Sequence, residues 1–232
     1  MSRIQLEPAY VLHSRSFRET SLIVEAFTRE YGRVAVVARG AKSSRSRWKN
    51  VLQPFRPLLL SWVQKTDLGT LSAADQVASL PPLQGQSLYC GLYLNELLMR
   101  LLHRGDPHAE VFERYRHVLS ELASEVFPQP LLRIFEKHLL ESIGYAMLLD
   151  REIENGTEVQ PQNWYDYAPD RGPVLARGPG NNRVSGAALL ALHSEDLQNA
   201  NLTELRMLMR RVIGYHLGDK PLASLSLFSS SC

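Results

Sequence analysis

The chain has 232 residues, of which 44% are hydrophobic and 22% are charged, and it contains two cysteines. These proportions are typical of a globular protein with one large or two ordinary domains, and two cysteines exclude a disulfide framework or a four-cysteine zinc site. The longest apolar stretches fall far short of the roughly 18 residues that a membrane-spanning helix needs, and residues 1–10 lack the apolar core of a signal peptide. We therefore expect a cytosolic protein without a membrane segment.

The net charge of +2 is an average over two unlike parts of the chain. Residues 1–80 hold twelve Lys and Arg against six Asp and Glu, which gives +6. The remaining residues hold 14 basic and 18 acidic side chains, which gives −4. This asymmetry indicates that the N-terminal part meets a polyanion and that the C-terminal part has another task.

The first 80 residues contain short segments rich in Val, Leu, Ile and aromatic residues, separated by charged or glycine-containing turns. This pattern predicts strands. In residues 20–28, successive side chains would point to opposite faces of a strand, and their pattern predicts a strand that is buried chiefly on one face. Five short strands in so few residues fit a small closed barrel better than an open sheet, because closure removes exposed edges. The predicted strands are residues 8–14, 20–28, 32–38, 55–63 and 68–74.

Two consecutive prolines, Pro81 and Pro82, end the strand-like region, and beyond them the hydrophobic period becomes helical. Apolar residues spaced by three and four predict helices over residues 90–102, 111–122 and 132–143. Each helix has one apolar face and the links are short, so we expect a helical bundle. The prediction is an α+β protein with a first domain at residues 1–80 and a helical domain at residues 81–232.

Residues 150–183 break the helical pattern, because glycine and proline recur too often for long elements. We expect a small irregular subdomain there, with a hairpin around Trp164–Val174. Helices resume after it, and Ser185 and Thr203 are the expected N-caps. The Ser-rich end of the chain, residues 221–232, is expected to fray.

The connection after the third predicted strand, residues 39–53, is the most basic part of the chain, and we call it the basic loop. Residues 31–66 hold eight basic side chains and no acidic one, so a phosphate backbone is the natural counter-charge. Trp48 or Tyr31 offers a ring on which an unstacked base can lie. The alternative is a solvated loop that protects a strand edge from aggregation. The predicted DNA-binding residues are Arg33, Arg39, Lys42, Arg45, Arg47, Trp48, Lys49 and Arg56.

The sequence contains little sign of catalytic chemistry. Its seven histidines are scattered and form neither a His-Glu-x-x-His pair nor a Cys-His cluster. A phosphate-binding loop and a Gly-x-Ser-x-Gly motif are both absent from the sequence. We therefore expect that the protein is not an enzyme and needs no cofactor.

Two cations near the start of the third predicted helix form a second candidate site. Arg133 and Lys137 lie beside its apolar face, an arrangement that can hold an acidic peptide ending in an apolar residue. In the alternative they belong to an ordinary helix flank, with Arg133 pairing Glu136 or Lys137 pairing Glu141. Four further basic residues either extend a path for nucleic acid or form an ordinary solvated surface of the helical domain. They are Arg206, Arg210, Arg211 and Lys220.

Several short motifs resemble, in order, those of the RecO family of bacterial recombination mediators. They occur in both halves of the chain, so the resemblance covers nearly all of it. In the N-terminal half they are Tyr10–Arg15, Glu19–Leu22, Ala38–Lys42 and Leu52–Phe55. In the C-terminal half they are Gly91–Leu98, Phe135–Glu136 with Leu139–Leu140, Gly144–Tyr145 and Leu217–Leu222.

The resemblance implies an N-terminal OB-fold barrel, a C-terminal helical domain and no catalytic turnover. It implies a cytoplasmic, nucleoid-associated protein that binds single- and double-stranded DNA, anneals complementary strands and associates with RecR. It also implies binding to the acidic C-terminal tail of the single-stranded DNA-binding protein (SSB), so that RecA can be loaded on coated DNA. Arg39 and Lys42 match the family's basic loop, and Arg133 matches the arginine that grips the SSB tail; Lys137 has no such match.

One feature departs from part of the family. Some members carry a four-cysteine zinc site in the irregular subdomain, whereas residues 150–183 contain no cysteine here. Zinc is therefore not expected, and the subdomain must be held by packing around Trp164, Tyr165 and Tyr167.

We expect the basic loop to lower the repulsion between two phosphate backbones, while the helical domain recruits the protein to SSB-covered DNA. Two alternatives come from other classes of protein. One is a metal-dependent nuclease that uses scattered histidines and carboxylates. The other is an adaptor that does not bind DNA and whose basic loop serves only solubility.

Overall fold

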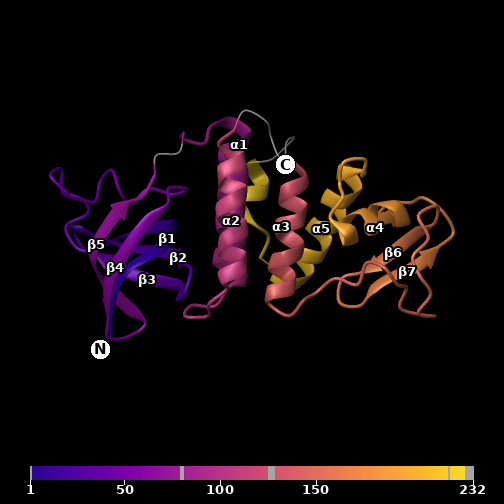
Figure 1. Cartoon of the computed structure of the whole chain (residues 1–232), viewed down its shortest axis with the longest axis horizontal. Coiled ribbons are helices and arrows are strands. Elements are labelled where there is room, and N and C mark those ends of the chain that lie inside the picture. Colours follow the sequence, from indigo (N-terminus) through magenta and orange to yellow (C-terminus); the bar gives the residue numbers. More distant parts are fainter. Residues whose placement is uncertain (1, 79–80, 125–128, 219, 228–232) are drawn as a thin grey trace. The chain divides into compact units, whose positions relative to one another are not determined.

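The structure is a computed structural model, and it describes residues 2–78, 81–124, 129–218 and 220–227 (Figure 1). The fold is α+β, as predicted, with a barrel, a second small sheet and helices. The chain forms two compact units: Met1–Phe127 with Leu222–Ser231, and Pro128–Pro221 with Cys232. The predicted domain boundary between residues 80 and 81 marks the change from strands to helices, and it stays a prediction.

The first unit is built around a closed barrel with the strand order β1-β2-β3-β5-β4. Paired strands are antiparallel except β3 and β5, which run parallel. This arrangement is that of an OB-fold, which confirms the expected fold. The strands are β1 (Ser2–Phe17), β2 (Ser21–Thr28), β3 (Gly32–Ala38), β4 (Leu58–Gln64) and β5 (Leu68–Gln76).

β1 is longer than predicted because its two halves pair with different strands. Ser2–Ala9 pairs with β4, and Ala9–Phe17 pairs with β2. The register shifts once after Ile4 and again after Val11, and such bulges bend a strand so that it can turn a barrel corner. The second bulge leaves Leu12 out of the ladder, so its carbonyl needs a partner elsewhere.

Two helices pack on the barrel within the first unit, α1 (Gly85–Leu101) and α2 (Ala109–Leu122). Asn95 of α1 donates its side-chain amide to the Leu12 carbonyl at 2.8 Å and accepts a hydrogen bond from the hydroxyl of Tyr115 on α2. Burial raises the pKa of Tyr115 well above its ordinary value, so the phenol keeps the proton that it donates. One buried side chain thus joins a strand and two helices.

β2 is buried on both faces, whereas the sequence predicted burial chiefly on one face. Val24 and Ala26 lie in the barrel core. On the outer side, the ring of Phe27 lies 5.5 Å from that of Phe112 on α2, measured between centroids. The alternation predicted the barrel side correctly, but the outer side is buried because a helix from a later part of the chain covers it.

The C-terminal segment returns to the first unit and forms a short 3-10 helix, η1 (Ala223–Leu227). The backbone amides of Ala223 and Ser224 donate to the two carboxylate oxygens of Glu96, each at 2.8 Å. Burial raises the pKa of Glu96, but the hydrogen bonds from Ser224 and Ala223, together with the charge of Arg100, outweigh that effect and lower the pKa overall. The prediction of fraying is therefore wrong for residues 222–227, and residues 228–232 lie outside the described part.

The second unit combines helices with a small antiparallel sheet of order β7-β6-β8. The predicted hairpin around Trp164–Val174 is confirmed by β6 and β7. α3 packs against α5, so the helices predicted to share one bundle divide between the two units. The elements are α3 (Gln129–Ser142), β6 (Trp164–Ala168), β7 (Gly172–Ala176), β8 (Arg183–Ser185), α4 (Gly186–Ser194) and α5 (Leu202–Leu217).

Of the two helix N-caps predicted in the second unit, one is confirmed and the other is wrong. Ser185 is the N-cap of α4, as predicted, and its hydroxyl accepts from the amide of Ala188 at 3.2 Å. α5 begins earlier than predicted, because Asn201 and not Thr203 is its N-cap. The Asn201 side chain accepts from the amide of Glu204 at 3.2 Å. Among the described residues, no helix is long and apolar enough to cross a membrane.

We predict that Asn95→Leu lowers the free energy of unfolding by at least about 1–3 kcal/mol, because the Leu12 carbonyl and the Tyr115 hydroxyl lose a buried partner. Urea unfolding measures the change. Tyr115→Phe is the matched control, since it removes one of the two bonds and is expected to cost less. A leucine variant as stable as the wild type would show that the bulge carbonyl finds another partner.

Candidate nucleic-acid interface

The basic loop joins β3 to the segment before β4, and a buried tryptophan anchors it to the barrel. Trp48 is 6% exposed and belongs to the barrel core together with Ala41 and Leu52 of the same loop. Its indole N–H donates to the carbonyl of Arg39 at 3.1 Å. At the other side of the loop, the amide of Lys42 donates to the carbonyl of Thr20 at 2.9 Å, which ties the loop to the β1–β2 turn.

The burial of Trp48 differs from the expectation of an exposed ring for base stacking. The ring fills space in the barrel core, and the Arg47 guanidinium carbon lies 4.1 Å from its centroid. Burying a large apolar ring against the barrel core is more favourable in free energy than leaving it exposed to water. Tyr31, the other ring considered, is 43% exposed and packs edge-on against Trp62.

The cations of the basic loop lie on the surface around this anchor. Arg39, Lys42, Arg45 and Lys49 are exposed, and none of them forms an ion pair with a described residue. Arg47 is also exposed, and it donates to the carbonyl of Ser72 at 3.1 Å. The loop therefore holds a fixed group of cations whose charge the described part of the protein leaves uncompensated.

A groove of about 770 Å³ opens beside the loop, bounded by the β1–β2 turn, the end of β3 and the β4–β5 turn. Arg39 belongs to both the loop and the groove, and Arg18 adds a second cation from the β1–β2 turn. The only acidic side chain among its lining residues is Glu19. The lining residues are Phe17, Arg18, Glu19, Thr20, Ser21, Val37, Arg39, Gly40, Thr66, Leu68, Gly69 and Thr70.

Sequence reasoning missed Arg18. Its guanidinium carbon lies 5.2 Å from the ring centroid of Phe17, and its backbone has a φ of +54°. This left-handed conformation lets the β1–β2 turn close tightly. A single arginine in a turn gives no sequence signal, because only the folded barrel places it in the same groove as Arg39.

Of the other two predicted cations, Arg33 lies away from the loop cluster. Arg33 lies at the start of β3, at the opposite end of that strand from Arg39, and donates to the carbonyl of Met99. Burial lowers the pKa of Arg33. Arg56 follows the loop and is half-buried. Arg33 was grouped with the loop by sequence distance, which does not record that β3 carries the chain across the barrel.

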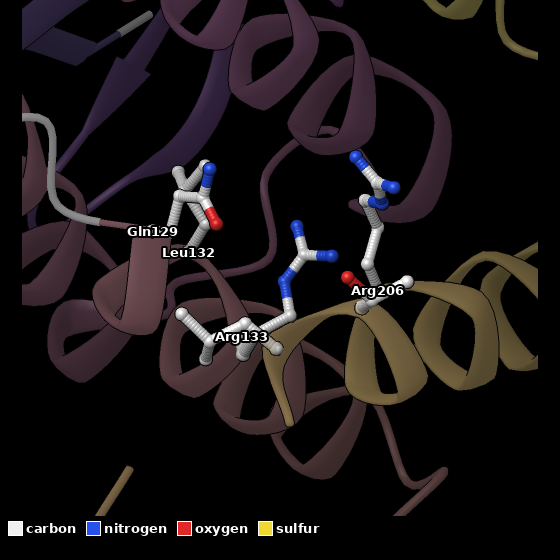
Figure 2. Close-up of a pocket in the computed structure, with 6 residues that line it drawn as sticks. Gln129, Leu132, Arg133 and Arg206 are labelled. Carbon is white, nitrogen blue, oxygen red and sulfur yellow. The ribbon is translucent and has the colours of Figure 1, made fainter. Parts of the chain in front are cut away.

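A second candidate site lies in the other unit, in a pocket of about 110 Å³ (Figure 2). Arg133 from α3 and Arg206 from α5 point into it side by side, and Gln129, Leu132, Leu202 and Thr203 complete its lining. The Arg133 side chain is 6% exposed and bonds Glu136 at 2.6 Å between Nη2 and Oε1. The Nε atoms of both arginines are buried without a hydrogen-bond partner among the described residues. The pocket thus has unused donors for an acidic group.

Lys137, the other predicted residue of this site, does not line the pocket. Its ammonium group donates to Glu195 at 2.7 Å and to the carbonyl of His193 at 3.2 Å, at the end of α4. The predicted pair of Arg133 with Glu136 is confirmed, whereas Lys137 pairs with Glu195 and not with Glu141. Although burial raises the pKa of Glu195, Lys137 and His138 lower it overall. Lys137 therefore fastens α3 to α4.

The barrel order, the parallel contact of β3 with β5 and the exposed cationic loop define an OB-fold protein with a candidate nucleic-acid interface. Residues 1–80 match the family model "Recombination protein O N terminal" and residues 83–226 match "Recombination protein O C terminal". The chain therefore belongs to the recombination protein O (RecO) family.

Curated relatives agree with this assignment over almost the full length. The chain is 47% identical to "DNA repair protein RecO" of Nitrosospira multiformis, with 95% of this chain and 93% of the relative covered. It is 45% identical to the protein of the same name in Nitrosococcus oceani, with 97% and 93% covered. The protein from Methylococcus capsulatus is also 45% identical, with 99% and 95% covered.

We predict that Trp48→Phe lowers the free energy of unfolding by about 1 kcal/mol, because the indole N–H bond to Arg39 is lost while most of the ring remains. Urea unfolding tests this, with Trp164→Phe in the half-buried start of β6 as a control in the other unit. Single-strand affinity is expected to change little. A large loss of affinity at unchanged stability would show that the Trp48 ring contacts bases.

Proposed function

We propose that this protein acts in DNA repair and recombination by binding single- and double-stranded DNA through its barrel and annealing complementary strands. The observation that carries the proposal is the group of exposed loop cations without counter-ions beside a groove on an OB-fold. A polyanion supplies the missing counter-charge and gains entropy from released counterions. The name "DNA repair protein RecO" of the relatives supports the same assignment.

Annealing follows from the same charges. Two complementary strands repel each other because each carries one negative charge per phosphate. A cationic surface that neutralises part of one backbone lowers this repulsion and allows the second strand to approach. The protein then acts by binding and positioning, without making or breaking a covalent bond and without a cofactor.

The pocket with Arg133 and Arg206 provides the second half of the proposal, which is recruitment. An acidic peptide such as the SSB C-terminal tail brings carboxylates that match the free donors of the two arginines. Leu132 and Leu202 offer apolar contact for the end of such a tail. Together with RecR, the bound protein then helps to load RecA on SSB-coated DNA at the nucleoid.

Strand annealing on SSB-coated DNA tests the function as a whole. The protein is expected to accelerate annealing of complementary strands that SSB covers, measured by loss of single-strand fluorescence. A parallel incubation of labelled DNA with Mg²⁺ or Mn²⁺ is expected to leave the strands intact. Cleavage would favour a nuclease, and no acceleration together with no DNA binding would favour an adaptor.

We predict that replacing Lys42, Arg45 and Lys49 together with alanine weakens binding to all DNA sequences. The slope of log affinity against log salt should flatten by up to about 0.7 per lost contact on single strands. Filter binding at several salt concentrations measures both quantities. The control variant replaces Arg151, Arg171 and Arg177, which are exposed in the second unit, and changes the net charge equally. Equal effects of the two variants would contradict a specific role of the loop.

We predict that Arg206→Ala weakens binding of an SSB-tail peptide by about tenfold or more, because a charge-assisted hydrogen bond is lost. Arg133→Gln should act in the same direction, since it keeps polar atoms near Glu136 but removes the charge. Lys137→Ala is the matched control and should leave peptide affinity within about twofold. Fluorescence anisotropy with a labelled peptide measures these affinities. Equal loss of peptide and naked-DNA binding would contradict the separation of the two sites.

A further inference from the structure

A carboxylate of α1 holds the start of the C-terminal segment. The backbone amides of Ala223 and Ser224 both donate to Glu96, each at 2.8 Å and each to a different oxygen. Leu222 and Ser224 are buried, so the segment also packs on the first unit. Hydrogen bonds to a charged group are about twice as strong as those between neutral groups. We call this contact the clasp, because it closes the chain back onto the first unit.

The clasp is fixed to the barrel through α1. Glu96 follows Asn95, whose side-chain amide donates to the Leu12 carbonyl of β1. The same Asn95 accepts a hydrogen bond from Tyr115 of α2. Two neighbouring residues of α1 therefore bind the barrel and the C-terminal segment. A pull on the segment is carried through Glu96 to α1 and from there to β1.

On its other side the clasp leads directly to α5. Residues 218–221 separate this helix from Leu222, and α5 supplies Arg206 to the pocket proposed for an acidic tail. The chain passes from the first unit to the second after Phe127 and returns after Pro221. The return connection ends at the clasp. Opening the clasp therefore frees α5 from this tether to the barrel, while the connection after Phe127 remains.

We propose that the clasp is a releasable tether that couples the DNA-binding barrel to the peptide-binding pocket. The inference rests on the proposed function and adds how the two sites act together. A closed clasp limits how far the two sites can move apart. Two linked sites that bind one target reach a higher effective concentration when their separation is limited in this way. SSB-coated DNA carries both ligands, so the closed clasp favours binding of DNA and tail at the same time.

Release of the clasp costs less than unfolding of the barrel. The segment that it holds is one short 3-10 helix near the end of the chain, and such segments open locally while the core stays folded. Closed and open forms can therefore interconvert in the native protein. In the open form each site still binds its own ligand, but the two sites act separately.

Hydrogen exchange in the full-length protein tests the clasp itself. Glu96→Gln replaces one acceptor oxygen by a donor group, so one of the two amides loses its partner. Ala223→Pro removes an amide from the other side of the contact and leaves the charge of Glu96 in place. Exchange of the Ser224 amide is expected to become about tenfold faster or more in both variants. Glu110→Gln, at an exposed carboxylate of α2, is the matched control and should leave this exchange unchanged. Unchanged exchange in the Glu96 variant would overturn the clasp.

Affinities for three ligands test the coupling separately. The ligands are a naked single strand, a labelled acidic tail peptide and SSB-coated single-stranded DNA. Both clasp variants should bind each of the first two within about twofold of the wild type. They should bind SSB-coated DNA about three- to tenfold more weakly. Unchanged or tighter binding of coated DNA, despite faster exchange, would overturn the coupling. If the wild type binds neither naked strand nor peptide, the proposed function fails, and the exchange result still decides whether the clasp exists.

Discussion

The hydrogen bond from Asn95 to the Leu12 carbonyl is the contact on which the architecture of the first unit depends. The bulge in β1 removes Leu12 from the ladder, and a buried carbonyl without a partner is costly. Asn95 satisfies it and accepts the Tyr115 hydroxyl, so α1 and α2 are held at one position on the barrel. The surrounding rings add apolar contact but fix no register by themselves, because packing is less directional than a hydrogen bond.

This attachment decides which part of the barrel remains free for a ligand. The outer side chains of β1 and β2, such as Tyr10 and Phe27, pack against α2. The groove is instead lined by the end of β3, by β5 and by the turns beside them. The basic loop lies next to that part of the barrel. Trp48 anchors the loop, because its ring belongs to the same core cluster as Ala38 at the end of β3.

The sequence predicted the features that depend on local order and missed those that depend on tertiary neighbours. Short apolar segments between turns were enough to predict the strands. The run of residues without an acidic side chain was enough to predict the basic loop. The burial of Trp48 was missed because a tryptophan among cations is typical of a ring that stacks on bases. Only the folded structure shows that this ring packs in the barrel core. Arg206 was not joined to Arg133 because α3 and α5 are far apart in the chain and only the fold places them at one pocket.

The two candidate sites differ in how their charges are compensated, and under the proposed function this difference separates the two ligands. The loop cations have no counter-ions among the described residues, so their attraction for a polyanion is strong at low salt and is screened as salt rises. Arg133 is buried and already paired with Glu136, so its charge is shielded from solvent and its geometry is set by that pair. Screening reaches a buried site much less than an exposed one. Under the proposed function, a rise in ionic strength therefore weakens DNA binding at the loop before it weakens binding of an acidic peptide at the pocket.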